Sequence, residues 1–111
     1  CPGGDENHHL ISTKQFEKMK NSAILVNTAR GEVVDDTALI SALETKQIAA
    51  VGLDVFNNEP NINPNLIKFE NAILLPHLGS ATQETREAMG FRVLDNIADF
   101  FEGKIPRDKV A

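Results

Sequence analysis

Three polar side chains of different chemistry follow short apolar runs in this 111-residue sequence. Arg30 lies in the segment NTARG, Glu59 in DVFNNEP and His77 in PHLGS. The apolar runs ahead of them are typical of buried strands in a parallel sheet. Because open α/β sheets bind ligands at the carboxyl ends of their strands, a cation, a carboxylate and an imidazole would meet in one crevice there. Such a set can bind an anionic substrate and move a proton.

Each of these residues also has a purely structural interpretation. An arginine ahead of a glycine often pairs with acids on the surface, a histidine after proline can cap a strand end, and a loop glutamate is usually solvated. Asp54 ends a second apolar run, AAVGLD, and an acid at such a place needs a hydrogen-bonding partner. That partner is either a ligand or a nearby backbone turn, and the residue types alone leave both alternatives open.

Composition restricts the classes of function. With 41% hydrophobic and 24% charged residues, the chain is typical of one globular domain. A formal net charge of -5 without basic clusters argues against binding nucleic acid or an anionic membrane. No apolar stretch approaches the roughly 20 residues of a membrane span. The single cysteine, Cys1, allows no internal disulfide, so a cytoplasmic location is expected. His8, His9, His77 and Cys1 do not show the spacing of a zinc site.

The hydrophobic pattern alternates between strand and helix. It predicts strands at residues 23–27, 49–55 and 72–75, helices at 13–20, 36–45 and 83–102, and a short helical turn at 66–67. Ser12 with Gln15, Asp35 and Thr82 have the types and positions of helix caps. This alternation predicts an α/β fold with a parallel, doubly wound sheet whose first strand is covered on both faces. The last eight residues, 104–111, are expected to be an extended polar tail.

Several of these segments, taken together, resemble the D-isomer-specific 2-hydroxyacid dehydrogenases. The matching segments are VNTARG, VVD, AVGLDVF, EP and LPHLGSAT, in this order from residue 26 to residue 82. The CPGG start and the form PHLGSAT are similar to the glyoxylate/hydroxypyruvate reductases of that family. The resemblance implies the second half of a Rossmann-type dinucleotide-binding domain over residues 1–82, a long helix over 83–103 that returns towards a substrate domain, and a tail over 104–111.

The family's glycine-rich fingerprint, and the residue that selects NAD or NADP, are not in this sequence. We therefore expect the chain to be a fragment of a two-domain enzyme. With a sheet edge left open, the isolated fragment is expected to be marginally stable or to associate, and to be inactive.

The resemblance also implies a role for each candidate residue. Arg30 would hold the carboxylate of a 2-oxo acid through two hydrogen bonds. His77 would be the general acid/base, and Glu59 its partner that fixes the imidazole. Asp54 would accept a hydrogen bond from the nicotinamide carboxamide. The residues expected to contact NAD or NADP are Cys1, Thr28, Arg30, Asp54, His77, Gly79 and Ser80, and no metal is expected.

The function implied is the reduction of a small 2-oxo acid, such as glyoxylate or hydroxypyruvate, to the D-2-hydroxy acid with NAD(P)H. A D-3-phosphoglycerate dehydrogenase-like enzyme and a non-catalytic, NAD(H)-sensing corepressor-like protein are the alternatives. The resemblance further implies a homodimer.

Overall fold

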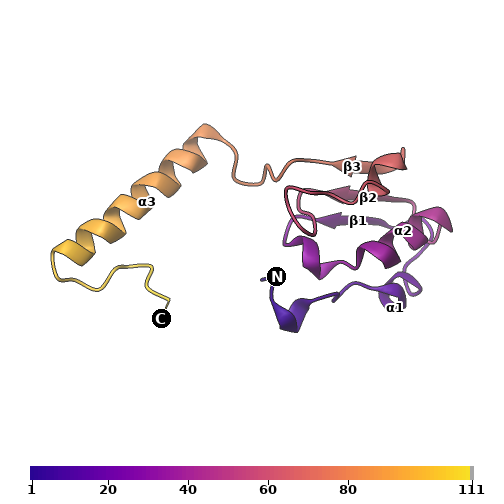
Figure 1. The fold of residues 1–111 in the computed structure, drawn as a ribbon, viewed down its shortest axis with the longest axis horizontal. Helices are drawn as coiled ribbons and strands as arrows, with labels where there is room; N and C mark the ends of the chain where they lie inside the picture. Colours follow the sequence, from indigo (N-terminus) through magenta and orange to yellow (C-terminus); the bar gives the residue numbers. More distant parts are fainter. Residues whose placement is uncertain (111) are drawn as a thin grey trace. The chain divides into compact units, whose positions relative to one another are not determined.

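The computed structural model describes residues 1–110, which divide into an N-terminal unit, Cys1–Gly79, and a C-terminal unit that starts at Ser80. The N-terminal unit contains three strands, β1 (Ile24–Asn27), β2 (Ala50–Leu53) and β3 (Ala72–Leu74). They form a parallel sheet in the order β1-β2-β3 (Figure 1). The predicted alternation of strands and helices in a parallel α/β sheet is therefore confirmed.

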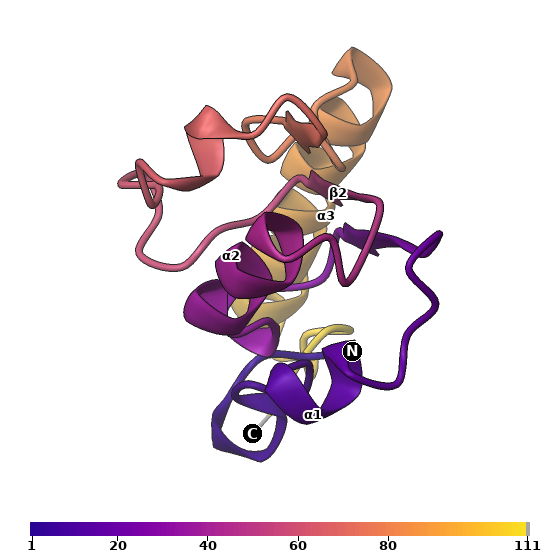
Figure 2. The same cartoon turned by 90° about the vertical axis from the view of Figure 1, so that its right-hand side faces the viewer.

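The helices of the N-terminal unit are short. α1 (Thr13–Phe16) packs beside α2 (Asp36–Glu44), as Figure 2 shows. The Asp35 side chain caps α2 by accepting the backbone N–H groups of Thr37 and Ala38, as its position in the sequence predicts. Three short 3₁₀ helices join the larger elements: η1 (Asp5–Asn7), η2 (Gly31–Val33) and η3 (Leu66–Lys68).

The first helix is shorter than the predicted range of 13–20. The predicted capping box between Ser12 and Gln15 is present, so the helix begins where expected. Beyond Glu17 the backbone bonds join residues three apart, from Lys18 to Gln15 and from Met19 to Phe16. These tighter turns replace the bonds between residues four apart that an α-helix requires, so regular helix stops at Phe16.

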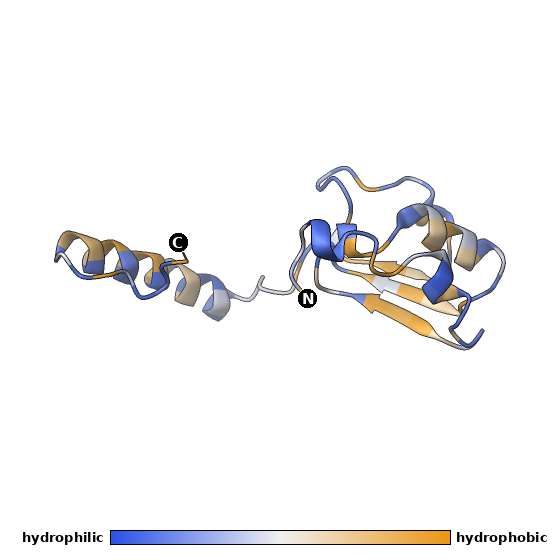
Figure 3. Ribbon diagram, turned by 90° about the horizontal axis from the view of Figure 1, so that it is seen from below, coloured by the Kyte–Doolittle hydropathy of each residue, from blue (hydrophilic) through white to orange (hydrophobic). Residues whose placement is uncertain are grey.

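The sheet buries one face only. The strand register aligns Val26, Gly52 and Ile73 in one row. Val26 and Ile73 are 66% and 67% exposed. On the opposite face of the sheet, Val51 lies in the core against α1 and α2. The strands are largely hydrophobic, as Figure 3 shows. The prediction that the first strand is covered on both faces is therefore wrong, because both α-helices of this unit contribute to the core on the same face.

The C-terminal unit is built on one long helix, α3 (Gln83–Phe101). The Thr82 side chain caps its first turn, and Gly103 follows its end with a φ of 73°, as the sequence predicts. No residue of α3 is buried within this unit, so its apolar stripe is exposed. The stripe comprises Met89, Val93, Ile97, Phe100 and Phe101. Among the described residues, no helix has the length and apolarity that crossing a membrane demands.

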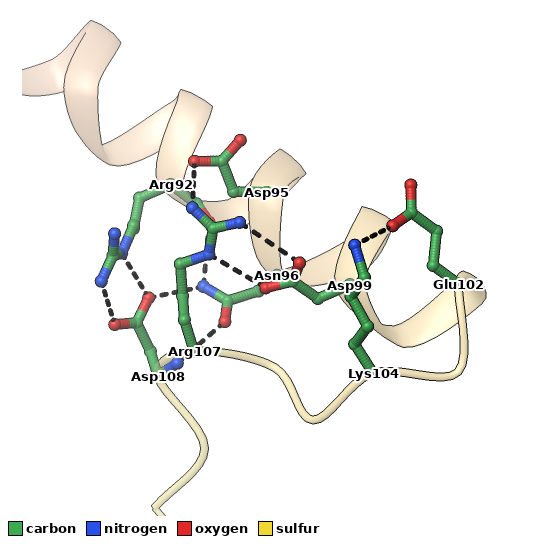
Figure 4. Close-up of polar contacts among 8 residues, drawn as sticks. All are labelled: Arg92, Asp95, Asn96, Asp99, Glu102, Lys104, Arg107 and Asp108. Atoms are coloured by element: carbon green, nitrogen blue, oxygen red, sulfur yellow. Dashed lines mark hydrogen bonds and ion pairs between the residues drawn. The ribbon is translucent and has the colours of Figure 1, made fainter.

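The tail after α3 is not extended, contrary to the sequence prediction. It turns back along the helix, and Asp108 takes two hydrogen bonds from the Arg92 guanidinium, at 2.6 and 2.7 Å (Figure 4). Arg107 pairs in the same way with Asp99 and also reaches Asp95. These ion pairs, which we call the tail clasp, hold residues 107–108 against α3. Residue 111, the last of the predicted tail, lies outside the described residues.

Candidate active site

A histidine–glutamate pair lies beyond the carboxyl ends of β2 and β3. His77 Nδ1 is 2.8 Å from Glu59 Oε2, although 18 residues separate them in the sequence. The other carboxylate oxygen, Glu59 Oε1, accepts the backbone N–H of Phe56 at 2.9 Å. Both side chains remain partly open to solvent, at 48% for His77 and 35% for Glu59. The glutamate is thus fixed by the backbone just after β2, and it fixes one nitrogen of the imidazole.

The protonation of this pair follows from its hydrogen bonds. The bond to His77 lowers the pKa of Glu59 most, and the Phe56 N–H and the charge of Arg30 lower it further. The carboxylate is therefore ionised at neutral pH and can only accept hydrogen bonds. Nδ1 of His77 must carry the proton of this contact, so Nε2 is the nitrogen left to exchange a proton with a ligand.

Asp54 anchors the loop that carries His77. Asp54 is only 7% exposed, and its two carboxylate oxygens accept the N–H groups of Leu78 at 2.6 Å and Gly79 at 2.8 Å. His77 itself has a φ of 56°, a backbone region that few residues other than glycine adopt. The carboxyl group bonds the two residues that follow, so it holds the histidine in this conformation. The sequence left a ligand or a backbone turn as the partner of Asp54, and the structure shows it bonded to a backbone turn.

Asn27 anchors the loop that carries Arg30, and sequence reasoning assigned this residue no role. It ends β1 and is only 6% exposed. Its amide accepts the Ala29 N–H at 3.0 Å and donates to the Arg30 carbonyl at 2.9 Å. The sequence contained a signal for this role, because a polar residue at the end of an apolar run needs hydrogen-bond partners when it is buried. The same argument applies to Asp54.

Gly31 brings the arginine loop into contact with the glutamate loop. It is buried, and a Cβ atom added there would overlap the backbone of Phe56 and Asn57. Only a residue without a side chain permits this approach. Because Phe56 also binds Glu59, the segments that carry Arg30 and Glu59 touch directly.

Two hollows adjoin the histidine–glutamate pair. One, of about 330 Å³, is lined by all three candidate catalytic residues, Arg30, Glu59 and His77, together with Gly31, Glu32, Phe56, Asn57 and Asn58. The other, of about 350 Å³, is mainly apolar and lies against Glu59, Pro60, Ile62, Pro76 and His77, with Phe56, Leu74 and Leu75. The structure thus brings the three residues around one open space, as the strand ends led us to expect.

The remaining candidates lie at different places. Thr28 is exposed directly after β1, Gly79 is exposed beside Asp54, and Cys1 is exposed at the start of the chain. Ser80 is exposed as well, but it belongs to the C-terminal unit. Within residues 1–110, no three His, Cys, Asp or Glu side chains are grouped so that they could hold a metal ion.

The fold and these strand-end loops define a nucleotide-binding α/β domain, and comparison with known proteins specifies the family. Residues 1–79 match the family described as "D-isomer specific 2-hydroxyacid dehydrogenase, NAD binding domain". The chain belongs to this family, as the resemblance of its motifs predicted.

Individual relatives agree with this assignment. Over 110 residues, which are 98% of the chain, it is 47% identical to glyoxylate/hydroxypyruvate reductase B of Escherichia coli. The structure of the NADPH-dependent glyoxylate/hydroxypyruvate reductase of Sinorhizobium meliloti, in complex with citrate, superposes with a TM-score of 0.90 at 38% identity, over 96% of this chain and 34% of that one. D-lactate dehydrogenase of Lactobacillus jensenii, solved with NAD⁺, superposes with a TM-score of 0.88 at 32% identity, over 100% of this chain and 38% of that one.

The predicted Rossmann-type fold is thereby confirmed. The chain spans about a third of the length of the curated relatives it matches.

Proposed function

We propose that this chain is part of an NAD(P)-dependent oxidoreductase that reduces a small 2-oxo acid, glyoxylate or hydroxypyruvate, to the D-2-hydroxy acid. The observation that carries the proposal is the meeting of Arg30, Glu59 and His77 around one hollow, with the Glu59–His77 bond of 2.8 Å already formed. Relatives named as glyoxylate/hydroxypyruvate reductases support the choice of substrate.

Each residue of the set would perform a separate task. The Arg30 guanidinium would hold the substrate carboxylate in a bidentate pair and keep the neighbouring carbonyl within reach of His77. His77 would give the proton on Nε2 to the carbonyl oxygen, while Glu59 holds Nδ1 and stabilises the imidazolium. In the reverse direction His77 would take the hydroxyl proton.

The reduced nicotinamide would supply the hydride for this reaction. The residues present fit such a group, because Thr28 and Gly79 stand exposed at the carboxyl ends of β1 and β3, where α/β sheets bind nucleotides. Gly79 and Thr28 would lie along the cofactor, and Cys1 and Ser80 remain proposed contacts. The main role of Asp54 would be to hold the histidine loop through its bonds to Leu78 and Gly79. Its carboxylate oxygens have further lone pairs, which would accept a hydrogen bond from the nicotinamide carboxamide.

The homodimer, the cytoplasmic location and the inactivity of the isolated chain remain predictions. They rest on the resemblance, on composition and on the open sheet edges.

The experiment is steady-state turnover by the full-length protein that contains this chain, followed by nicotinamide absorbance. NADH and NADPH are each offered with glyoxylate, hydroxypyruvate and phosphohydroxypyruvate. We expect turnover with one of the first two acids, and its loss in Arg30→Ala. Arg107→Ala, which removes an equal charge from the C-terminal unit, is the matched control and should keep activity.

Two other outcomes would change the assignment. Preference for phosphohydroxypyruvate would indicate the phosphoglycerate dehydrogenase-like alternative. Cofactor binding without turnover of any acid would overturn the enzyme and favour a nucleotide-sensing protein.

A further inference from the structure

We propose that Asn27 is a positioning residue that sets the substrate-binding geometry of Arg30. The inference rests on the proposed function, because it explains how the arginine of that site is held. Asn27 and Asp54 are the buried polar residues of the described chain. Asn27 ends β1 and Asp54 directly follows β2, each beneath a loop of the candidate site. Asp54 serves the histidine loop, and Asn27 serves the arginine loop.

The amide of Asn27 determines the path of the chain from residue 27 to residue 30. It accepts the N–H of Ala29 and donates to the carbonyl of Arg30, so both of its polar atoms are used inside one turn. The Arg30 guanidinium in turn donates from its Nη1 to the Ala29 carbonyl at 2.7 Å. The guanidinium is therefore tied to the Ala29–Arg30 peptide unit, which lies between the two peptide units that Asn27 bonds.

Asn27 is in turn fixed to the sheet. Its backbone carbonyl accepts the N–H of Asp54 at 3.0 Å, and its register partner on β2 is Leu53. At 6% exposure Asn27 is shielded from water that could replace its bonds. The arginine loop thus takes its position from the end of β1, and Gly31 carries that position to the backbone of Phe56 beside Glu59.

The consequence is specific to the carboxylate of the substrate. If the amide no longer donates to the Arg30 carbonyl, the turn can relax and displace the guanidinium. A displacement of about 1 Å can change reaction rates about a hundredfold. The Glu59–His77 bond does not involve Asn27, so proton transfer should change little.

The test compares Asn27→Asp with Asn71→Asp in the full-length protein. Aspartate keeps the acceptor for the Ala29 N–H but cannot donate to the Arg30 carbonyl. Asn71 is the matched control, since its amide donates to the Ala49 carbonyl at 2.7 Å, at the amino ends of the strands. We expect the KM for the 2-oxo acid to rise about tenfold or more in Asn27→Asp. The KM for NADPH should rise less than that for the acid, and neither constant should change in Asn71→Asp.

A double-mutant cycle separates positioning from a general structural effect. If Asn27 acts through Arg30, then Asn27→Asp should add little to the KM of Arg30→Lys. Fully additive effects, or an unchanged KM for the acid in Asn27→Asp, would overturn the proposal. If Asn27→Asp does not fold, Asn27→Ser carries the same test, because its short hydroxyl cannot span the turn to Arg30.

The two proposals can fail separately. If Arg30→Lys leaves the KM for every 2-oxo acid unchanged, the proposed function is wrong. If Arg30→Lys raises that KM but neither Asn27 variant does, only the positioning role is wrong.

Discussion

The loops of the candidate site and the tail clasp are both held by polar contacts, but in different environments. The residues Asp54 and Asn27 are 7% and 6% exposed, and their side chains bond to backbone N–H and C=O groups. The side chains of Arg92 and Asp108 in the tail clasp are 54% and 44% exposed. Buried hydrogen bonds are expensive to lose because the freed groups have no water, whereas exposed ion pairs contribute little and are screened by salt.

This difference indicates where precise geometry is needed. Arg30, Glu59 and His77 are themselves exposed, as residues that meet a ligand must be. Their positions are determined one layer below, by the buried residues Asn27 and Asp54. The tail clasp has no such buried layer, so its geometry should respond readily to salt.

The largest effect on stability is expected from Asp54→Asn. An asparagine offers one acceptor where Leu78 and Gly79 present two N–H groups, so one buried donor loses its partner. The loss should be about 1–3 kcal/mol in the free energy of unfolding, measured by denaturant titration. Asp35→Asn is the control, because asparagine caps a helix as well as aspartate does. Equal losses in the two variants would show that Asp54 has no special role.

The next largest loss of stability is expected from Gly31→Ala, where the cause is steric overlap and not a lost hydrogen bond. The added methyl group would collide with the backbone of Phe56 and Asn57 and force the arginine loop away from the glutamate loop. We expect a destabilisation of about 1–3 kcal/mol together with a lower kcat/KM. Gly90→Ala is the control, because nothing lies within 4 Å of a Cβ atom at that position. Full activity in Gly31→Ala would mean that the two loops need not touch.

A smaller effect, dependent on pH, is expected from Glu59→Gln. The pKa of Glu59 lies below its ordinary value of 4.5, mainly because of the bond to His77. The folded state therefore favours the charged carboxylate. Its contribution to stability is present above pH 4.5 and is lost as the pH falls through the lower, folded pKa. Thermal melts should show the variant less stable at neutral pH and equal to the wild type in acid. A difference that grows towards low pH would contradict this sign.

The smallest effect concerns the tail clasp. The bond to Arg92 lowers the pKa of Asp108 to about 2, so the clasp should persist down to that pH and loosen below it. Salt should act at neutral pH, because the Debye length falls to about 3 Å at 1 M. The Asp108 N–H donates to the side-chain oxygen of Asn96 at 3.0 Å. We expect the hydrogen exchange of this N–H to become faster when the salt concentration is raised to about 1 M. The Leu78 N–H, bound by buried Asp54, should not respond. If both amides respond to salt alike, the two regions do not differ as described.

Much of this account could be predicted from local sequence signals. Strand–helix alternation, the caps at Asp35 and Thr82, and the stop at Gly103 depend on residues close in the chain, and all were found. The meeting of Arg30, Glu59 and His77 followed from the geometry of parallel strands.

The features that were missed depend on distant partners. The open face of β1 could not be foreseen, because apolar strands look alike whether or not this chain supplies the covering helices. The tail clasp joins exposed residues up to 16 positions apart without any periodic pattern. The role of Asn27 was missed although its position carried the same signal as that of Asp54.

The most direct test of the proposed site is a single turnover of enzyme-bound NADPH with hydroxypyruvate in the full-length protein. His77→Gln is compared with His8→Gln, which changes an exposed histidine in the loop after η1. We predict that His77→Gln, saturated with NADPH, oxidises it about 10²–10⁴-fold more slowly than the wild type, while His8→Gln reacts at the wild-type rate. A wild-type rate in His77→Gln would contradict the central claim that His77, held by Glu59, transfers the proton.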